Sequence, residues 1–90
     1  MTATVWQRND HWVGTQIDDS FVMLDFEGGT YVSLNVTATD VWNALEDPSS
    51  AEKITGIMTE RYEVSNEECA AAVDRVLADF VAKRLIQPVA

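Results

Sequence analysis

The stretch GGTYVSLNVTATDVW, from Gly28 to Trp42, decides the fold because two different periodicities meet within it. Before Asn35 the residues alternate as those of β-strands do, and beyond it apolar residues recur at helical spacing. The segment Thr37–Asp40 fits a capping box in its broader form, with Asn35 as an alternative N-cap. The stretch therefore predicts a short strand over residues 30–34 that runs directly into a helix.

Two further strands are predicted upstream of this junction. Residues 12–17 alternate, and residues 21–26, FVMLDF, are apolar on both faces, as is typical of a central strand. Turn residues at 18–20 and 27–29 separate the three segments. The pattern predicts a three-stranded antiparallel meander in which residues 30–34 form an edge strand.

Helical signals dominate the rest of the chain. The first helix should end before Pro48, and two further capping boxes, SSAE at 49–52 and SNEE at 65–68, open the second and third helices. The third is the longest, over about residues 66–84, with its apolar stripe at Cys69, Val73, Val76, Leu77 and Phe80. A sheet and a helical layer with one apolar face each should pack together, which predicts an α+β, winged-helix-like fold. We expect a loosely ordered N-terminal arm at residues 1–10 and a single domain at residues 11–90.

Composition and charge restrict the function. The chain has 90 residues, 47% of them hydrophobic, and a net charge of −9 from 15 acidic and six basic side chains. Such a charge disfavours nucleic acid and anionic membranes and favours a basic peptide or protein face. The single cysteine excludes an intramolecular disulfide, and no N-terminal apolar run resembles a signal peptide. We therefore expect a cytoplasmic protein.

Catalytic candidates are few. His11 is the only histidine, Cys69 falls on an apolar helical stripe, and the acidic pairs occupy turns or first helical turns, where they cap backbone amides. No ligand spacing indicates a metal site. The sequence predicts no enzyme, no metal and no cofactor. Trp6 and Trp12 are left open between packing on the core and contact with a partner.

The predicted edge strand is the strongest candidate for a binding surface, since residues 30–34 contain neither charge nor proline. A helix covers such an edge, a dimer pairs it, or it stays open to accept an extended peptide as a fourth strand. For the last case, we expect one flank of the third helix to form a second wall. The residues predicted to bind peptide are Thr30, Tyr31, Val32, Ser33, Leu34, Ala70, Val73, Asp74, Leu77 and Val81.

One motif carries a resemblance to a known family. The pattern Leu34-Asn35-x-Thr37-Ala38-x-x-x-Trp42, followed by Arg61-Tyr62-x-Val64 and a long final helix that runs into Leu85-Ile86, resembles the PqqD-like family over about residues 12–88. These proteins are precursor-peptide recognition elements. The resemblance implies a domain without catalysis that binds a leader peptide along its third strand against its third helix. It also implies partners: the precursor peptide and a modifying enzyme such as a leader protease, a cyclase or a radical-SAM protein.

The chain departs from the family pattern at Glu46-Asp47-Pro48, and at Arg84, where the family often has glycine. It also lacks the Pro-Glu pair associated with the pyrroloquinoline quinone pathway. These departures favour a free-standing recognition protein of a lasso-peptide or related pathway. The alternative is a winged-helix DNA-binding module, which the acidic third helix disfavours. Homodimer formation by strand pairing is left open.

Overall fold

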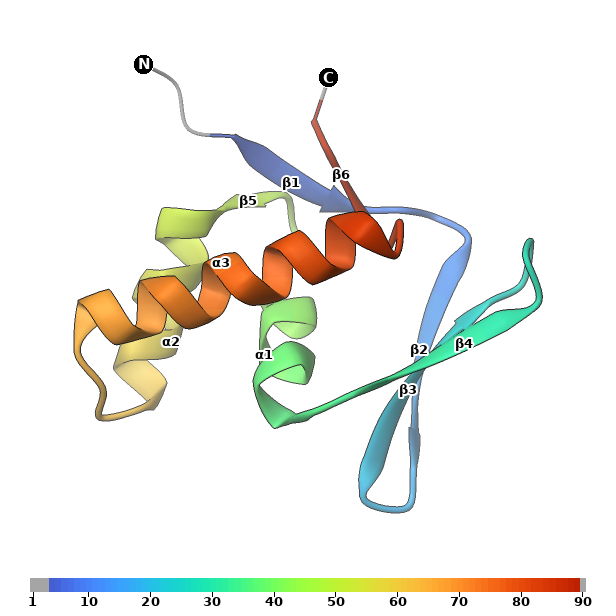
Figure 1. The fold of residues 1–90 in the computed structure, drawn as a ribbon, viewed down its shortest axis with the longest axis horizontal. Coiled ribbons are helices and arrows are strands. Elements are labelled where there is room, and N and C mark those ends of the chain that lie inside the picture. Colours follow the sequence, from blue (N-terminus) through green and yellow to red (C-terminus); the bar gives the residue numbers. More distant parts are fainter. Residues whose placement is uncertain (1–3, 90) are drawn as a thin grey trace.

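The computed structural model describes residues 4–89, and Figure 1 shows their arrangement. The elements follow the chain in the order β1 (Val5–Arg8), β2 (Trp12–Ile17), β3 (Ser20–Asp25), β4 (Thr30–Leu34), α1 (Val36–Ala44), β5 (Ser49–Ser50), α2 (Ala51–Arg61), α3 (Asn66–Ala82) and β6 (Ile86–Pro88). A three-stranded meander followed by three helices confirms the predicted α+β fold class.

The meander β2–β3–β4 forms one sheet with β3 in the centre. Its register pairs Val13 with Leu24 and Leu24 with Tyr31, and both connections are antiparallel. The first turn places Asp18 at a φ of 54°, and the second places Gly29 at a φ of 73°, a conformation that glycine adopts without steric cost. β4 is therefore an edge strand, as predicted.

Each helix begins at a side chain that caps its first turn. Asn35 accepts a hydrogen bond from the Ala38 amide at 2.8 Å, so the alternative cap at Asn35 is the one that the structure uses. Ser50 and Ser65 cap α2 and α3 in the same way. Because the Asn35 cap follows Leu34 directly, the end of β4 is fixed to the start of α1 without a loop.

The structure adds a second sheet, of order β5–β1–β6, that the sequence did not predict. Within the expected arm at residues 1–10, residues 5–8 form β1, and residues 1–3 lie outside the described part of the chain. Two strands far apart in the sequence hold β1, with Trp6 opposite both Ser49 and Pro88. Trp6 also packs on the core, which explains why a segment without clear periodicity is ordered.

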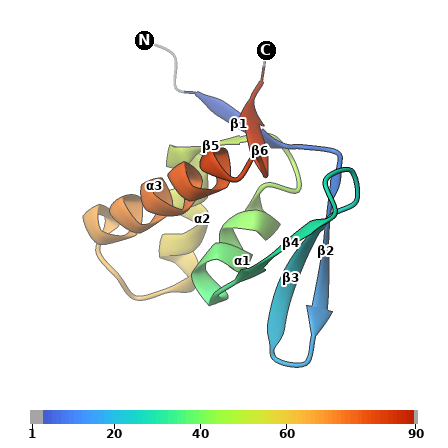
Figure 2. The same cartoon turned by 45° about the vertical axis from the view of Figure 1, so that its right-hand side comes forward.

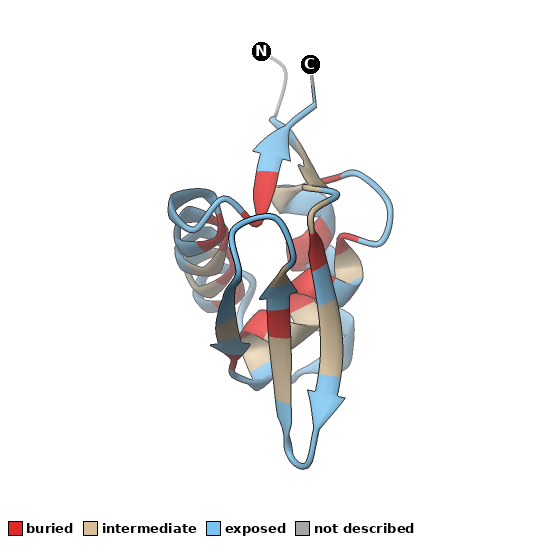
Figure 3. Cartoon of the chain, turned by 90° about the vertical axis from the view of Figure 1, so that its right-hand side faces the viewer, coloured by how far each residue is buried: buried red, intermediate tan, exposed pale blue. Residues whose placement is uncertain are grey.

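The core is built mainly from the three helices, and strands of both sheets contribute Trp12, Met23, Leu34 and Ile86. Figure 2 shows the two sheets beside the helical layer. The fully buried side chains of the core are Phe80, Met23, Leu45, Ile54, Leu85, Val41 and Val73. Trp12 is 8% exposed and belongs to this core, so both tryptophans left open by the sequence pack inward. Figure 3 looks onto the β2–β3–β4 sheet from outside, with the helices behind it. Over residues 4–89, no helix has the length and apolarity needed to cross a bilayer.

Candidate functional site

The open edge of β4 is the first component of the candidate site. β4 pairs with β3 along one side, and no strand of residues 4–89 pairs with its other side. The strand has no charge, no proline and no bulge to block pairing with a further strand. Its free side therefore presents backbone groups to solvent.

The register identifies which backbone groups face outward. Phe26, directly after β3, donates its amide to the carbonyl of His11, so the backbone groups of Phe26 point toward β2. In an antiparallel sheet, successive residues point their backbone groups to opposite neighbours. By this alternation Met23, three residues before Phe26, points its backbone groups toward β4, where it pairs with Val32. Tyr31 and Ser33, the neighbours of Val32, therefore direct their N–H and C=O groups away from β3. Two donors and two acceptors are available on the open edge.

A hollow of about 370 Å³ adjoins the C-terminal end of β4. It lies between the start of α1 and the N-terminal half of α3, and its walls are mainly apolar. The lining residues are Val36, Thr37, Met58, Tyr62, Val64, Glu68, Cys69 and Ala72. Val36 is 72% exposed, so this hollow offers apolar surface at the point where β4 ends. A chain running along β4 would reach it directly.

A second hollow, of about 520 Å³, lies at the N-terminal end of β4. Thr30 and Val32 line it from the strand, and Lys83 and Arg84 line it from the end of α3. The two hollows thus lie at opposite ends of β4, and each has a wall from α3. β4 and α3 run in opposite directions, as Figure 1 shows, with α1 between them at one end. Together β4, α3 and the two hollows define the candidate groove.

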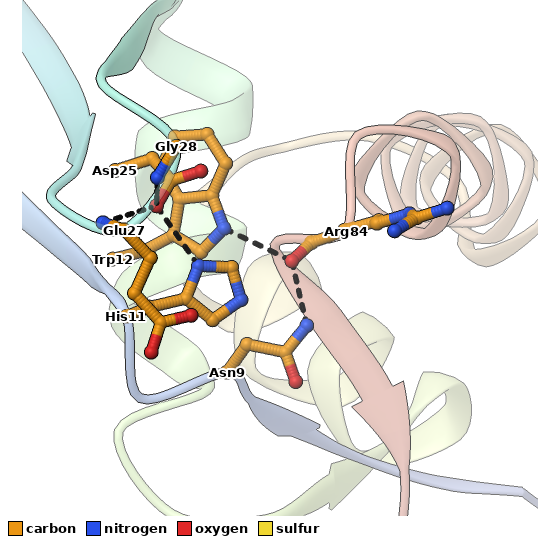
Figure 4. A network of polar contacts seen from close by, with 7 residues as sticks. All are labelled: Asn9, His11, Trp12, Asp25, Glu27, Gly28 and Arg84. Atoms are coloured by element: carbon orange, nitrogen blue, oxygen red, sulfur yellow. Dashed lines mark hydrogen bonds and ion pairs between the residues drawn. The ribbon is translucent and has the colours of Figure 1, made fainter.

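A network of polar contacts closes the N-terminal end of the groove (Figure 4). The carbonyl of Arg84 accepts hydrogen bonds from Trp12 Nε1 at 3.0 Å and from Asn9 Nδ2 at 2.6 Å. Asp25 accepts from the Gly28 amide and lies 3.0 Å from His11 Nδ1. These contacts, with the backbone bond from Gly28 as the largest, hold the pKa of Asp25 below its ordinary value. The network fixes the sheet against the end of α3.

Arg84 occupies an unusual backbone conformation in this network. Its φ is 63°, in the left-handed region that favours glycine. The amide of Leu85 donates to the carbonyl of Phe80 and that of Arg84 to the carbonyl of Val81, which is the Schellman pattern of a helix C-terminus. Arg84 therefore forms the turn for which the family often uses glycine. An arginine in this left-handed conformation is sterically less favourable than a glycine.

A second polar cluster borders the other hollow. Asp40 accepts hydrogen bonds from Arg61 Nη1, at 3.1 Å, and from the hydroxyl of Tyr62. The hydrogen bond to Asp40 raises the pKa of Tyr62. The cluster joins α1 to the end of α2 and holds the Tyr62 ring, which lines the hollow.

The structure places the five predicted β4 residues in three different environments. Tyr31 and Ser33 point their side chains to the outer face of the sheet, and Tyr31 is 72% exposed. Val32 and Leu34 point inward, where Leu34 joins the core and Val32 packs against it. Thr30 is exposed at the start of the strand. The backbone of all five residues lies on the candidate groove, and their contact with a peptide stays a prediction.

The structure divides the five predicted α3 residues between the core and one flank of the helix. Val73 and Leu77 belong to the core, and Leu77 also lines a hollow with Asp74 and Val81. Contact of these residues with a peptide stays a prediction. Ala70, Asp74 and Val81 are on the opposite flank of α3. That flank lines hollows shared with Trp6 of β1 and with Ala51 of α2. The helical phase identified the buried stripe correctly, but periodicity alone does not say which flank of the stripe faces β4.

Several residues of the groove were not among those predicted to bind peptide. They include Glu68, Cys69 and Ala72 of α3 and Lys83 at its C-cap, at a spacing that keeps them near one helical face. Val36, Tyr62 and Val64 were missed because they lie at helix ends, outside every apolar stripe. The sequence feature that could have identified them is an apolar side chain next to a helix cap. His11 pairs with Asp25, and Cys69 is a buried free thiol.

Comparison with known proteins identifies the family. The family model described as "Coenzyme PQQ synthesis protein D (PqqD)" matches residues 20–86, which span β3 to β6. The chain belongs to the PqqD family. The match includes β4, α1 and α3, and hence both walls of the groove. No curated protein matches the sequence.

Two solved structures are similar to this PqqD-family chain. One is "TbiB1 in Complex with the TbiA(beta) Leader Peptide", with 26% identity, a TM-score of 0.81, and coverage of 93% of this chain and 98% of that chain. The other is "Lasso peptide synthetase B1 complexed with the leader peptide", with 23% identity, a TM-score of 0.79, and coverage of 92% and 98%. The second similarity concerns the fold alone. Both solved proteins are bound to a leader peptide.

Proposed function

We propose that this chain binds the leader segment of a ribosomally synthesised precursor peptide as an added strand along β4. The guest would pair with the outward backbone groups of Tyr31 and Ser33 and place side chains in the hollows at the two ends of β4. The observation that carries the proposal is the unpaired edge of β4, which adjoins the C-terminal end of α3. Membership of the PqqD family and the leader-bound state of TbiB1 support it.

The chain acts in this proposal as an adaptor rather than an enzyme. It holds the leader and delivers the attached core peptide to a modifying enzyme or a leader protease. Main-chain pairing supplies affinity that depends little on the guest's sequence, and the two hollows supply side-chain selectivity. The end of the groove near α1 favours apolar guest residues. At the other end, Lys83 and Arg84 lie beside Asp25 and Glu27, so polar guest residues are better suited there.

Amide hydrogen exchange tests the proposal at single-residue resolution. The probe is a synthetic leader segment of the precursor encoded beside the gene of this chain, titrated into the ¹⁵N-labelled protein. Tyr31 and Ser33 amides should exchange freely without peptide and become protected with it, because only these β4 amides gain a partner. The Val32 amide, already directed at β3, should change less. Binding that leaves the exchange of Tyr31 and Ser33 unaltered would refute strand addition at β4.

A further inference from the structure

The outer face of the β2–β3–β4 sheet has an unusual composition for an uncovered surface. The register groups Val13, Leu24 and Tyr31 in one row across the three strands. Their exposed fractions are 48%, 42% and 72%. None of the strand positions on this face carries a charged side chain. Those positions are Val13, Thr15, Ile17, Ser20, Val22, Leu24, Tyr31 and Ser33.

All helices of the described chain lie behind this sheet, so nothing in residues 4–89 covers the outer face (Figure 3). Two further apolar side chains extend the row. Ile17 is 51% exposed at one end, and Phe26, directly after β3, is 67% exposed at the other. Monomeric soluble proteins rarely expose apolar residues in such a continuous group without a partner. We call the group Val13, Ile17, Val22, Leu24, Phe26 and Tyr31 the outer apolar face.

Charge around the outer apolar face limits what can cover it. Asp18 and Asp19 occupy the turn at one end, and Glu27 lies in the turn at the other end. No lysine or arginine occurs between Arg8 and Lys53, so the whole sheet lacks a basic residue. A complementary partner would therefore present an apolar centre with a rim of lysine or arginine. A second copy of this chain, with its net charge of −9, lacks such a rim.

The outer apolar face is continuous with the proposed peptide edge, because β4 belongs to both. A guest strand paired with β4 would widen the same sheet, and alternate side chains of that guest would emerge beside Tyr31 and Ser33. A partner docked on the outer apolar face would then contact the bound peptide as well. This geometry suits the enzyme that receives the peptide, since docking and delivery would use one surface.

We propose that the outer apolar face docks the processing enzyme, through an apolar patch rimmed by basic residues beside that enzyme's peptide channel. The inference rests on the proposed function, because the bound leader completes the surface. Docking should be tighter with the leader present than without it. It should also weaken as salt rises, since the acidic rim supplies the charge complementarity.

The test measures two affinities for each variant by biolayer interferometry. One is for the synthetic leader, and the other is for the purified processing enzyme encoded beside the precursor, with the leader at saturation. The double variant Val13→Thr/Leu24→Thr removes apolar surface while threonine keeps the strand propensity. Val89→Thr is the matched control, because Val89 is 44% exposed and lies outside this sheet. Asp18→Asn/Asp19→Asn probes the rim without altering the apolar residues.

The double variant should bind the enzyme at least about tenfold more weakly, as expected for loss of central apolar contacts, and keep its leader affinity. The control should match wild type, and the rim variant should show a shallower salt dependence. Wild-type enzyme affinity in a double variant that still binds leader would overturn the docking proposal and leave the proposed function standing. Failure of the wild type to bind leader would overturn both. A concentration-dependent dimer that the double variant abolishes would instead identify a homodimer interface.

Discussion

Replacement of Ser33 by proline tests whether β4 accepts a guest strand. The Ser33 amide points away from β3, so proline there removes a donor from the open edge without removing a bond of the β3–β4 ladder. Proline is tolerated in strands at such edge positions. The preceding residue, Val32, is already extended, which is the geometry that proline favours in its neighbour. Val32→Pro, in contrast, would break the pairing with Met23 and damage the sheet itself.

The expected loss of affinity follows from the missing bond and from its unpaired partner. A net hydrogen bond contributes about 0.5–1.5 kcal/mol, and a buried carbonyl left without a donor costs about 1–3 kcal/mol. The guest carbonyl opposite Ser33 would be left without a donor, so it would incur this cost when it is packed between β4 and α3. The sum, about 1.5–4.5 kcal/mol, corresponds to a loss of leader affinity of at least about tenfold.

Gln16→Pro is the matched control for this experiment. Gln16 lies on β2, the other edge of the same sheet, and its backbone also points away from β3 by the same alternation. Both variants place proline on an open edge, so their effects on folding should be similar. Fluorescence anisotropy with a labelled leader then gives the two affinities. Equal leader affinity for folded Ser33→Pro and Gln16→Pro would refute guest pairing with β4.

Three further changes test other parts of the structure. Arg84→Gly should stabilise the fold by about 1 kcal/mol, because a left-handed non-glycine residue costs about 1–2 kcal/mol and the added freedom of unfolded glycine offsets about 0.4–1 kcal/mol. In thermal unfolding, Arg84→Ala should show no such gain. Acid should destabilise the protein through Asp25, because the pKa of its carboxyl is lower in the folded protein than in the unfolded chain. Its contribution to the free energy of unfolding is present above about pH 4 and is lost as the pH falls through the lowered pKa. Asp25→Asn should flatten this part of the stability profile, measured by urea unfolding at pH 3 and pH 6. Ala72→Gln should weaken leader binding, because Ala72 lines the apolar hollow at the end of β4. Ala70→Gln should leave leader binding unchanged, because Ala70 lies on the opposite flank of α3. The reverse result would support the α3 flank that the sequence predicted.

Local signals were sufficient for most of the fold. Alternation and turn residues predicted β2, β3 and β4, and the serine caps of α2 and α3 act near the predicted positions. These features depend on residues close in sequence, which is why periodicity detects them. β1 was missed for the opposite reason. Its partners are at residues 49–50 and 86–88, and its order depends on contacts that no local pattern of VWQR reveals.

The same distinction applies to the candidate site. The edge strand was predictable because the absence of charge and proline at residues 30–34 is a property of the strand alone. The flank of α3 that adjoins β4 was not predictable, because the choice of flank depends on where the sheet lies relative to the helix. The helical stripe contained Val73 and Leu77, which the structure buries, and periodicity alone gave no physical reason to prefer the predicted Ala70 flank over the Ala72 flank. Only the three-dimensional placement of β4 separates those two alanines.

The fixed separation of β4 and α3 follows from contacts at both ends of the candidate groove. At one end, Trp12 and Asn9 donate to the carbonyl of Arg84, which ties the β2 side of the sheet to the end of α3. At the other end, the Asn35 cap joins β4 to α1, and Asp40 of α1 accepts from Arg61 of α2. A groove held at both ends requires little reordering when an extended chain enters it, so less of the interaction free energy is lost on binding. In the proposed complex, most of the remaining entropy loss would therefore fall on the guest peptide.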